Sequence, residues 1–158
     1  MRHAKSVSRK DWAEGKKHRP DVDRPLNRRG QRQAKALVAL LEAYGVSRLA
    51  SSSATRCVQT ITPYAKATGI EIETFDEFTE EAFTAHRKPT KQAMKELVAQ
   101  QLADPDRPLA ISGHRPVLPT MGGVVHAGNH PMATAECLVV HLDAKGHQFR
   151  QEWHRPSV

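Results

Sequence analysis

Residues 48–69, RLASSSATRCVQTITPYAKATG, place a short strand directly before a helix and decide the fold class. We expect a short buried strand at 48–51 and a helix from about Ala54 to Thr68. Gly69 is placed to end this helix, because glycine readily adopts the left-handed conformation that follows many helices. Pro63 is expected to kink it, because proline lacks a backbone N–H. The stretch therefore predicts one strand–helix unit.

Further strands and helices alternate around this unit. Asn27 is a plausible N-cap, and apolar residues recur behind it with helical spacing as far as Gly45. Strands separated by helices of ten or more residues indicate a parallel sheet. We predict an α/β fold: a three-layer sandwich with a mostly parallel central sheet flanked by helices and an antiparallel edge hairpin near the C-terminus. The expected elements are helices at 27–45, 90–103 and 116–126, strands at 70–73 and 109–112, a long loop over 75–90, and hairpin strands at 136–142 and 148–153.

Three of the expected strands lead into polar segments. Ser51 and Ser52 follow the first strand, Gly113 and His114 follow another, and the loop 76–83 follows a third. In an open parallel sheet, ligands bind outside the carboxyl ends of the strands. We therefore expect all three segments to face the same rim of the sheet.

The composition is that of one globular domain, predicted to span residues 1–158. No stretch approaches the roughly 20 apolar residues needed to cross a bilayer, and the basic N-terminus has no signal-peptide pattern. The two cysteines, Cys57 and Cys137, have no metal-ligand spacing and suit a reducing compartment, so we expect a cytoplasmic protein without membrane contact.

The positive charge is concentrated near the N-terminus. The net charge is +7, and residues 1–32 alone hold eleven Lys/Arg against four Asp/Glu. Trp12 is the one Phe, Trp or Tyr in that stretch, whereas a nucleic-acid binder usually combines basic residues with stacking aromatics or a recognition helix. We therefore favour a phosphorylated small molecule or an acidic protein as the partner over nucleic acid.

Histidine and arginine side chains occur at positions that such a rim would bring close together. His3 follows Arg2, Arg56 opens a helix after a strand, and His114 lies just past another strand. A neutral imidazole can attack phosphorus and form a phosphohistidine, which divides hydrolysis into two easier displacements. Phosphoryl transfer places negative charge on the equatorial oxygens, so the site also needs fixed cations. Arginine suits this role because its planar fork pairs two phosphate oxygens at once.

Hydrolysis of a phosphate ester also needs a proton donor for the leaving oxygen, normally a carboxylic acid with a raised pKa. Glu77, Glu80 and Glu81 all lie in the loop predicted to reach the rim. Like charges at this proximity raise one another's pKa. Any of the three carboxyl groups fits this role on spacing alone.

Four motifs carry a family resemblance, in order along the chain. Residues 2–4 match the signature Arg-His-Gly/Ala, and residues 23–34 match a Pro-Leu-Thr/Asn-x-x-Gly-x-x-Gln-Ala helix entry. Residues 51–60 match Ser-Ser-x-x-x-Arg-x-x-Gln-Thr, and residues 112–114, Ser-Gly-His, match the motif with the second histidine. At these residues the chain resembles the histidine phosphatase superfamily, also called phosphoglycerate-mutase-like.

The resemblance implies a role for each matched residue. His3 would be the phosphorylated nucleophile, Arg2 and Arg56 would hold the phosphoryl oxygens, and His114 would be the second histidine of the phosphate pocket. The proton donor of the family aligns best with Glu80, with Glu81 and Glu77 as alternatives. The resemblance implies a metal-independent phosphatase without a cofactor.

Two branches of the superfamily are similar to this chain. Residues 2–6 and 23–26 resemble SixA-type phosphohistidine phosphatases, whereas residues 54–60 and 78–81 look closer to the C-terminal phosphatase domain of actinobacterial MutT-type Nudix fusions. The second resemblance is favoured and implies a nucleotide-related substrate, downstream of 8-oxo-guanine nucleotide clean-up, and a Nudix domain or protein as partner. In the family a hydrophobic strand precedes the Arg-His motif. Here Met1 alone precedes it, so we expect one of three situations: the chain is a fragment of a longer polypeptide, its start is drawn too late, or the central strand is absent.

Several other patterns have simpler interpretations. His126 and His130 have the spacing of metal ligands on a helix, but Gly128 and Pro131 disfavour a helix there, so we interpret both as loop histidines. Residues 16–19, Lys-Lys-His-Arg, are expected to form a solvated loop that could guide an anionic substrate. A non-enzymatic alternative is an inactive phosphatase-like docking module.

Overall fold

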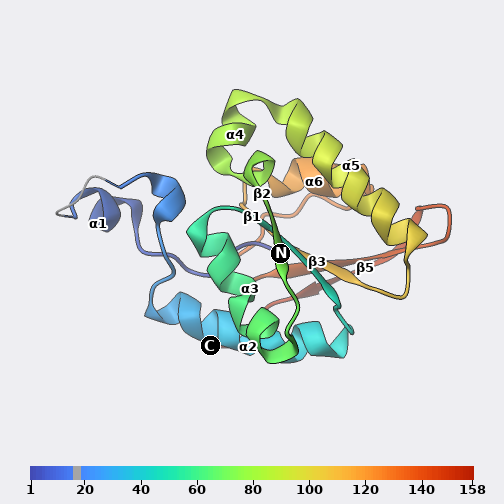
Figure 1. Ribbon diagram of the computed structural model, residues 1–158, viewed down its shortest axis with the longest axis horizontal. Helices are drawn as coiled ribbons and strands as arrows, with labels where there is room; N and C mark the ends of the chain where they lie inside the picture. The colour runs from blue at the N-terminus through green and yellow to red at the C-terminus, as the bar shows by residue number, and fades with distance from the viewer. Residues whose placement is uncertain (16–18) are drawn as a thin grey trace.

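A parallel three-stranded sheet forms the middle layer, and helices lie on both of its faces (Figure 1). The structure, a computed structural model, describes residues 1–15 and 19–158. The strand order is β2-β1-β3, with α2 and α3 on one face and α5 and α6 on the other. The predicted α/β fold with a parallel sheet flanked by helices is confirmed. The bounds are β1 Arg48–Ser52, β2 Ile72–Phe75, β3 Leu109–Ser112, α2 Arg28–Ala43, α3 Thr55–Thr68, α5 Arg87–Ala103 and α6 Leu118–Val124.

The helix boundaries follow the predicted caps. The Asn27 side chain accepts a hydrogen bond from the Gly30 N–H at the start of α2, which satisfies one of the free amides of the first turn. Gly45 and Gly69 follow α2 and α3 with φ angles of +61° and +74°, a conformation that glycine adopts without strain. The helix α3 continues through Pro63 to Thr68.

The long loop predicted over 75–90 is wrong. This stretch contains a 3₁₀ turn, Asp76–Phe78, and a short helix, α4, Glu80–Ala85, and α5 begins at Arg87 rather than near 90. Phe78 and Phe83 are buried in the core between the sheet and α5, so tertiary packing stabilises a segment that has no clean periodicity. The Thr79 side chain caps α4 by accepting a hydrogen bond from the Ala82 N–H.

The C-terminal hairpin is present, but it forms a sheet of its own. Strands β4, Cys137–Leu142, and β5, Gln148–His154, pair antiparallel with each other. Residues 1–3 lie between this hairpin and β3: the Arg2 N–H bonds to the Glu136 carbonyl, while the His3 N–H bonds to the Gly113 carbonyl. The chain's first residues therefore connect the two sheets.

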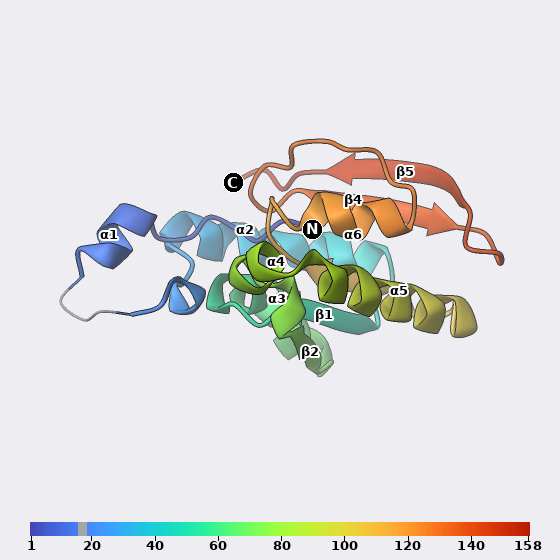
Figure 2. The same cartoon turned by 90° about the horizontal axis from the view of Figure 1, so that it is seen from above.

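A basic arm projects from one end of the sandwich and contains helix α1, Arg9–Ala13, and the 3₁₀ turn Asp21–Asp23 (Figure 2). Of the predicted loop 16–19, residues 16–18 lie outside the described part of the chain. Among the described residues, none of the helices combines the length and the apolar character that a membrane crossing requires.

Candidate active site

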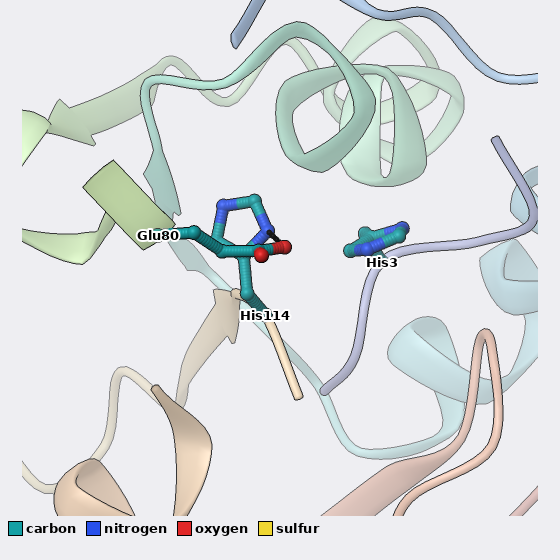
Figure 3. A group of neighbouring side chains, drawn as sticks. All are labelled: His3, Glu80 and His114. Atoms are coloured by element: carbon teal, nitrogen blue, oxygen red, sulfur yellow. Dashed lines mark ion pairs between the residues drawn. The ribbon is translucent and has the colours of Figure 1, made fainter. Parts of the chain in front are cut away.

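Three strand ends meet at one rim, as the sequence predicted. The His114 imidazole follows β3 and lies 2.9 Å from the Ser52 hydroxyl at the end of β1. On its other side, His114 Nδ1 lies 3.2 Å from a carboxylate oxygen of Glu80, at the start of α4. Figure 3 shows Glu80 beside His114, with His3 facing the pair from the chain's first segment. The site is therefore assembled from four separate parts of the sequence.

The His3 imidazole is held with one nitrogen occupied. Its Nδ1 lies 2.8 Å from the Ala4 carbonyl, so Nδ1 carries the proton and donates it, while Nε2 keeps a free lone pair. His3 is only 7% exposed. Burial is the main cause that lowers the pKa of this imidazole to about 3; the hydrogen bond to the Ala4 carbonyl opposes it, and the neighbouring His114, Arg56 and Arg2 side chains add to the lowering. At neutral pH the His3 imidazole is therefore uncharged.

The loop around His3 is held by the helix-entry and arginine motifs. The Thr60 hydroxyl accepts a hydrogen bond from the Ala4 N–H, and the Gln33 amide oxygen accepts one from the Lys5 N–H. Gly30 lies so close to this loop that a Cβ atom there would come within 1.9 Å of the Lys5 carbonyl oxygen. These motif residues therefore hold the segment that carries His3 through contacts with Ala4 and Lys5.

The His114 side chain is fully buried between two partners. Burial lowers its pKa, although the nearby Glu80 carboxylate opposes that effect. In the neutral form, Nδ1–H donates to Glu80 and Nε2 accepts from the Ser52 hydroxyl, so both ring nitrogens are satisfied. The Cys57 thiol is buried 3.4 Å from Nε2, and burial raises its pKa to about 12.

Two arginines supply fixed positive charge. The Arg56 guanidinium is completely buried and pairs at 3.2 Å with both the Asp21 and Glu80 carboxylates. The half-buried Arg2 donates to the Met132 carbonyl at 2.8 Å. In residues 1–15 and 19–158, the Nε atoms of both arginines are buried and have no hydrogen-bond partner. Buried donors without a partner are costly, so an anion that accepted from them would be bound favourably.

Glu80 is the glutamate that joins the site, but its pKa contradicts our expectation. The hydrogen bond from His114 holds the pKa of Glu80 well below its usual range, and the Arg56 and Arg9 cations add to this effect against the cost of burial. The predicted raising of this pKa by neighbouring carboxylates is therefore wrong for the free site. Glu77 and Glu81 are not part of the close group of His3, Glu80 and His114.

Two contributors, Arg9 and Asp21, were missed by sequence reasoning, and a third, Ser52, was expected only as part of the rim. Arg9 of α1 contacts Glu80 at 2.6 Å, although its side chain is 66% exposed. Asp21 binds Arg56 and also Arg24, at 2.8 Å. Ser52 binds His114 through its hydroxyl. Asp21 lies two residues before the helix-entry motif, and that position was the one available signal for it; nothing in the sequence distinguishes Arg9 from the other exposed basic residues.

A basic pocket of about 700 Å³ opens in front of His3 and Glu80. Lys5 and Arg115 line it, and both are exposed and make no ion pair among the described residues. His3, Glu80 and His114 also offer potential metal ligands within 4.8 Å of one another, the one such group found in the described residues. His130, by contrast, contacts Glu136 at 3.2 Å and packs against Trp153.

Comparison with known proteins finds relatives in sequence and in structure. The 8-oxo-(d)GTP phosphatase of Mycolicibacterium smegmatis is 39% identical over 80 residues, which is 51% of this chain but only 25% of that protein. This chain therefore spans about a quarter of the length of that relative. SixA from Agrobacterium tumefaciens has a TM-score of 0.66 at 24% identity, covering 99% of this chain and 95% of that one.

A second solved structure, the protein histidine phosphatase SixA complexed with tungstate, has a TM-score of 0.70 at 19% identity and covers 99% of this chain and 94% of that one. At these identities the likeness concerns the fold. The family model of the histidine phosphatase superfamily (branch 1) matches residues 1–114, a span that holds His3, Arg56, Glu80 and His114. On this match, the chain belongs to the histidine phosphatase superfamily (branch 1).

Proposed function

We propose that this chain is a phosphatase that hydrolyses a phosphomonoester or phosphoramidate through a covalent phosphohistidine on His3. The observation that carries the proposal is a neutral imidazole with a free Nε2 beside two arginines whose buried Nε donors lack partners. In the first step Nε2 attacks phosphorus while the bond from phosphorus to the leaving group breaks. In the second step water attacks phosphorus, the P–N bond breaks, and inorganic phosphate leaves.

Glu80 is the proposed proton donor in the first step and the proton acceptor in the second. The free site holds Glu80 ionised, because His114, Arg56 and Arg9 all stabilise its charge. A bound phosphoryl group changes this balance: it competes for the arginine cations and brings negative charge close to the carboxylate, and both effects raise the pKa. Protonation of Glu80 is therefore coupled to substrate binding.

Arg2, Arg56 and His114 are the proposed phosphate ligands. Arginine provides two parallel donors to a phosphoryl group and stays charged throughout the reaction. Arg56 is oriented in advance by its bonds to Asp21, so little side-chain entropy remains to be lost on binding. No metal takes part in the proposed steps, because histidine and arginine supply the nucleophile and the charge.

The proposed substrate is a small phosphorylated molecule with further anionic groups, and a nucleotide is the first candidate. Lys5 and Arg115 line the pocket without ion pairs among the described residues, so they are free to bind charge beyond the transferred phosphoryl group. The partial similarity to an 8-oxo-(d)GTP phosphatase supports this class. A Nudix domain or protein as partner stays a prediction.

A SixA-type activity on protein phosphohistidine is the second candidate. It is favoured by the exposed Arg9 beside Glu80 at the pocket, since an exposed cation at the mouth is accessible to a protein substrate. The two candidate substrates are ranked by comparing the rates at which the chain hydrolyses nucleoside phosphates and a phosphohistidine-carrying protein at equal concentration. A Lys5→Ala, Arg115→Ala double variant should raise KM for the nucleotide more than for a chromogenic phosphomonoester with one phosphoryl group.

The test of the phosphatase proposal is turnover of a chromogenic phosphomonoester in excess EDTA. Wild type should be active, and His3→Ala should lose activity together with the covalent phosphoenzyme trapped by rapid quenching. His147→Ala is a matched control, because His147 is an exposed histidine in the hairpin turn away from the site. If wild type and His3→Ala are equally inert on every substrate, the docking-module alternative is favoured instead.

A further inference from the structure

The two arginines of the candidate site are held in different ways. The Arg56 guanidinium is paired with the Asp21 and Glu80 carboxylates. The Arg2 guanidinium makes no ion pair within the part of the chain that the structure describes. Its one hydrogen bond in that part goes from Nη1 to the Met132 carbonyl, at 2.8 Å. The direction of the Arg2 side chain therefore depends on how firmly this carbonyl is held.

The Met132 carbonyl belongs to a segment without regular structure. Residues 126–136 connect α6 to β4 and contain turns but no helix or strand. The repeating hydrogen bonds of a helix or a sheet do not fix the peptide planes of such a segment. Its buried N–H and C=O groups need other partners, and side chains are the ones at hand.

Glu136 holds the same peptide unit from its other side. The peptide between Met132 and Ala133 carries the carbonyl that accepts from Arg2 and also the N–H that donates to the Glu136 carboxylate. A trans peptide is planar, and its C=O and N–H point in opposite directions, so a partner on one group also fixes the other. The contacts therefore run from Arg2 through a single peptide plane to Glu136.

Glu136 is itself held at two further points. Its second carboxylate oxygen lies 3.2 Å from Nε2 of His130, and the His130 ring packs against Trp153 of β5 with 4.4 Å between the ring centroids. Its backbone carbonyl accepts a hydrogen bond from the Arg2 N–H at 3.0 Å. The Glu136 side chain is only 12% exposed, so these hydrogen bonds are shielded from water and strengthened.

We propose that Glu136 is a positioning residue for phosphate binding, because its carboxylate fixes the peptide whose carbonyl orients the Arg2 guanidinium. This role depends on the proposed function of Arg2 as a phosphate ligand. An arginine that is oriented in advance loses less side-chain freedom when it binds an anion, so its release should weaken binding by about fivefold. The charge of Glu136 acts in the opposite direction, since a carboxylate close to Arg2 repels phosphate. A positioning role and a purely electrostatic role therefore predict opposite signs.

The test is the dissociation constant for inorganic phosphate, measured by calorimetry on the full chain, which needs no turnover. Glu136→Ala should bind phosphate about fivefold more weakly than wild type. Glu136→Gln should bind at least as tightly as wild type, because its amide oxygen can still accept from the Ala133 N–H. Glu152→Ala is the matched control and should change nothing. The Glu152 carboxylate also lies beside a histidine of the hairpin, His141, at 2.8 Å, but accepts from no backbone N–H among the described residues.

A double-mutant cycle tests whether Glu136 acts through Arg2. In an Arg2→Ala background, Glu136→Ala should cause no further weakening, whereas equal weakening in both backgrounds would overturn the proposal. Wild-type affinity in Glu136→Ala, or a Glu136→Gln variant as weak as Glu136→Ala, would overturn it too. If Arg2→Ala alone binds phosphate as tightly as wild type, the phosphate-ligand role of Arg2 and the positioning role of Glu136 both fail.

Thermal unfolding of each variant checks that it is folded. If Glu136→Ala does not fold, Glu136→Asp takes its place in the same measurements. This variant keeps the charge but shortens the reach to the Ala133 N–H, so it should bind phosphate about threefold more weakly than wild type. Unchanged affinity in Glu136→Asp would overturn the proposal.

Discussion

The replacement Gly30→Ala tests how the nucleophile is positioned. Gly30 lies in the first turn of α2, where alanine would ordinarily stabilise the helix by up to about 1 kcal/mol relative to glycine. Here the added Cβ would come within 1.9 Å of the Lys5 carbonyl oxygen and 2.8 Å of its carbonyl carbon. Both are backbone atoms of the loop that carries His3, so no side chain can move aside to relieve the contact.

The size of the effect follows from this distance. Ordinary contact begins at 3.4 Å, so helix and loop must separate by about 1.5 Å. Overpacking of this kind lowers the free energy of unfolding by about 1–3 kcal/mol, which exceeds the stabilisation that alanine would otherwise give the helix. The separation would also weaken the hydrogen bond from the Lys5 N–H to Gln33 and displace His3. A displacement of about 1 Å at a reacting group lowers the rate by about a hundredfold.

The assay combines urea unfolding with steady-state kinetics on a chromogenic phosphomonoester. Gly123→Ala is the matched control, because it also lies in a helix and its added Cβ would have no neighbour within 4 Å. We expect Gly30→Ala to lose about 2 kcal/mol of stability and about two orders of magnitude in kcat/KM, while Gly123→Ala loses neither. If Gly30→Ala is as stable and as active as Gly123→Ala, the close approach of α2 does not position His3.

Two other perturbations follow from the same contacts. Asp21→Asn should lower kcat/KM by about tenfold, because Arg56 loses an ionic partner but keeps its hydrogen bond to the residue 21 carbonyl. The control is Asp23→Asn, which lies in the same 3₁₀ turn and has no ion pair among the described residues, and it should leave kcat/KM unchanged. The second concerns pH. The pKa of His3 is lowered to about 3 from 6.5, so the unfolded chain takes up this proton first, and the free energy of unfolding should fall between about pH 6.5 and pH 3. In urea titrations across that range, His3→Gln should show a smaller fall; an identical fall would mean that His3 is not held neutral.

Much of the fold was predictable because its signals are local. The strand and helix of residues 48–69 are specified by a short apolar run, a helical period and Gly69 as the stop, and the structure retains all three. The cap at Asn27 is equally local, since its side chain accepts a hydrogen bond from the Gly30 N–H only three residues further along the chain. The stretch 76–85 was misjudged because Phe78 and Phe83 are buried by contacts with other elements of the fold, and the partners in β1 and α6 lie more than twenty residues away in sequence.

The candidate site likewise combines features that follow from the sequence with features that only the tertiary structure determines. The chain's own sequence determined the α/β class and indicated His3, Arg56 and His114 as candidate site residues. Arg56 and His114 each lie at a strand or helix end marked by their neighbours along the chain, whereas His3 was indicated by its motif. The choice of Glu80 among three glutamates was decided by tertiary structure, since the placement of the 3₁₀ turn and of α4 determines which carboxylate reaches His114.

Tertiary structure alone also decided the charge state of the site and the gap behind it. The pKa of Glu80 is lowered by groups from three distant segments, and no local pattern of carboxylates reports on them. The gap is an apolar groove of about 600 Å³ lined by residues of both β3 and β4, two strands more than twenty residues apart in sequence that belong to different sheets. Strand pairing and electrostatic interactions act between residues that are distant in sequence. Sequence patterns, in contrast, report only on interactions between residues that are close along the chain.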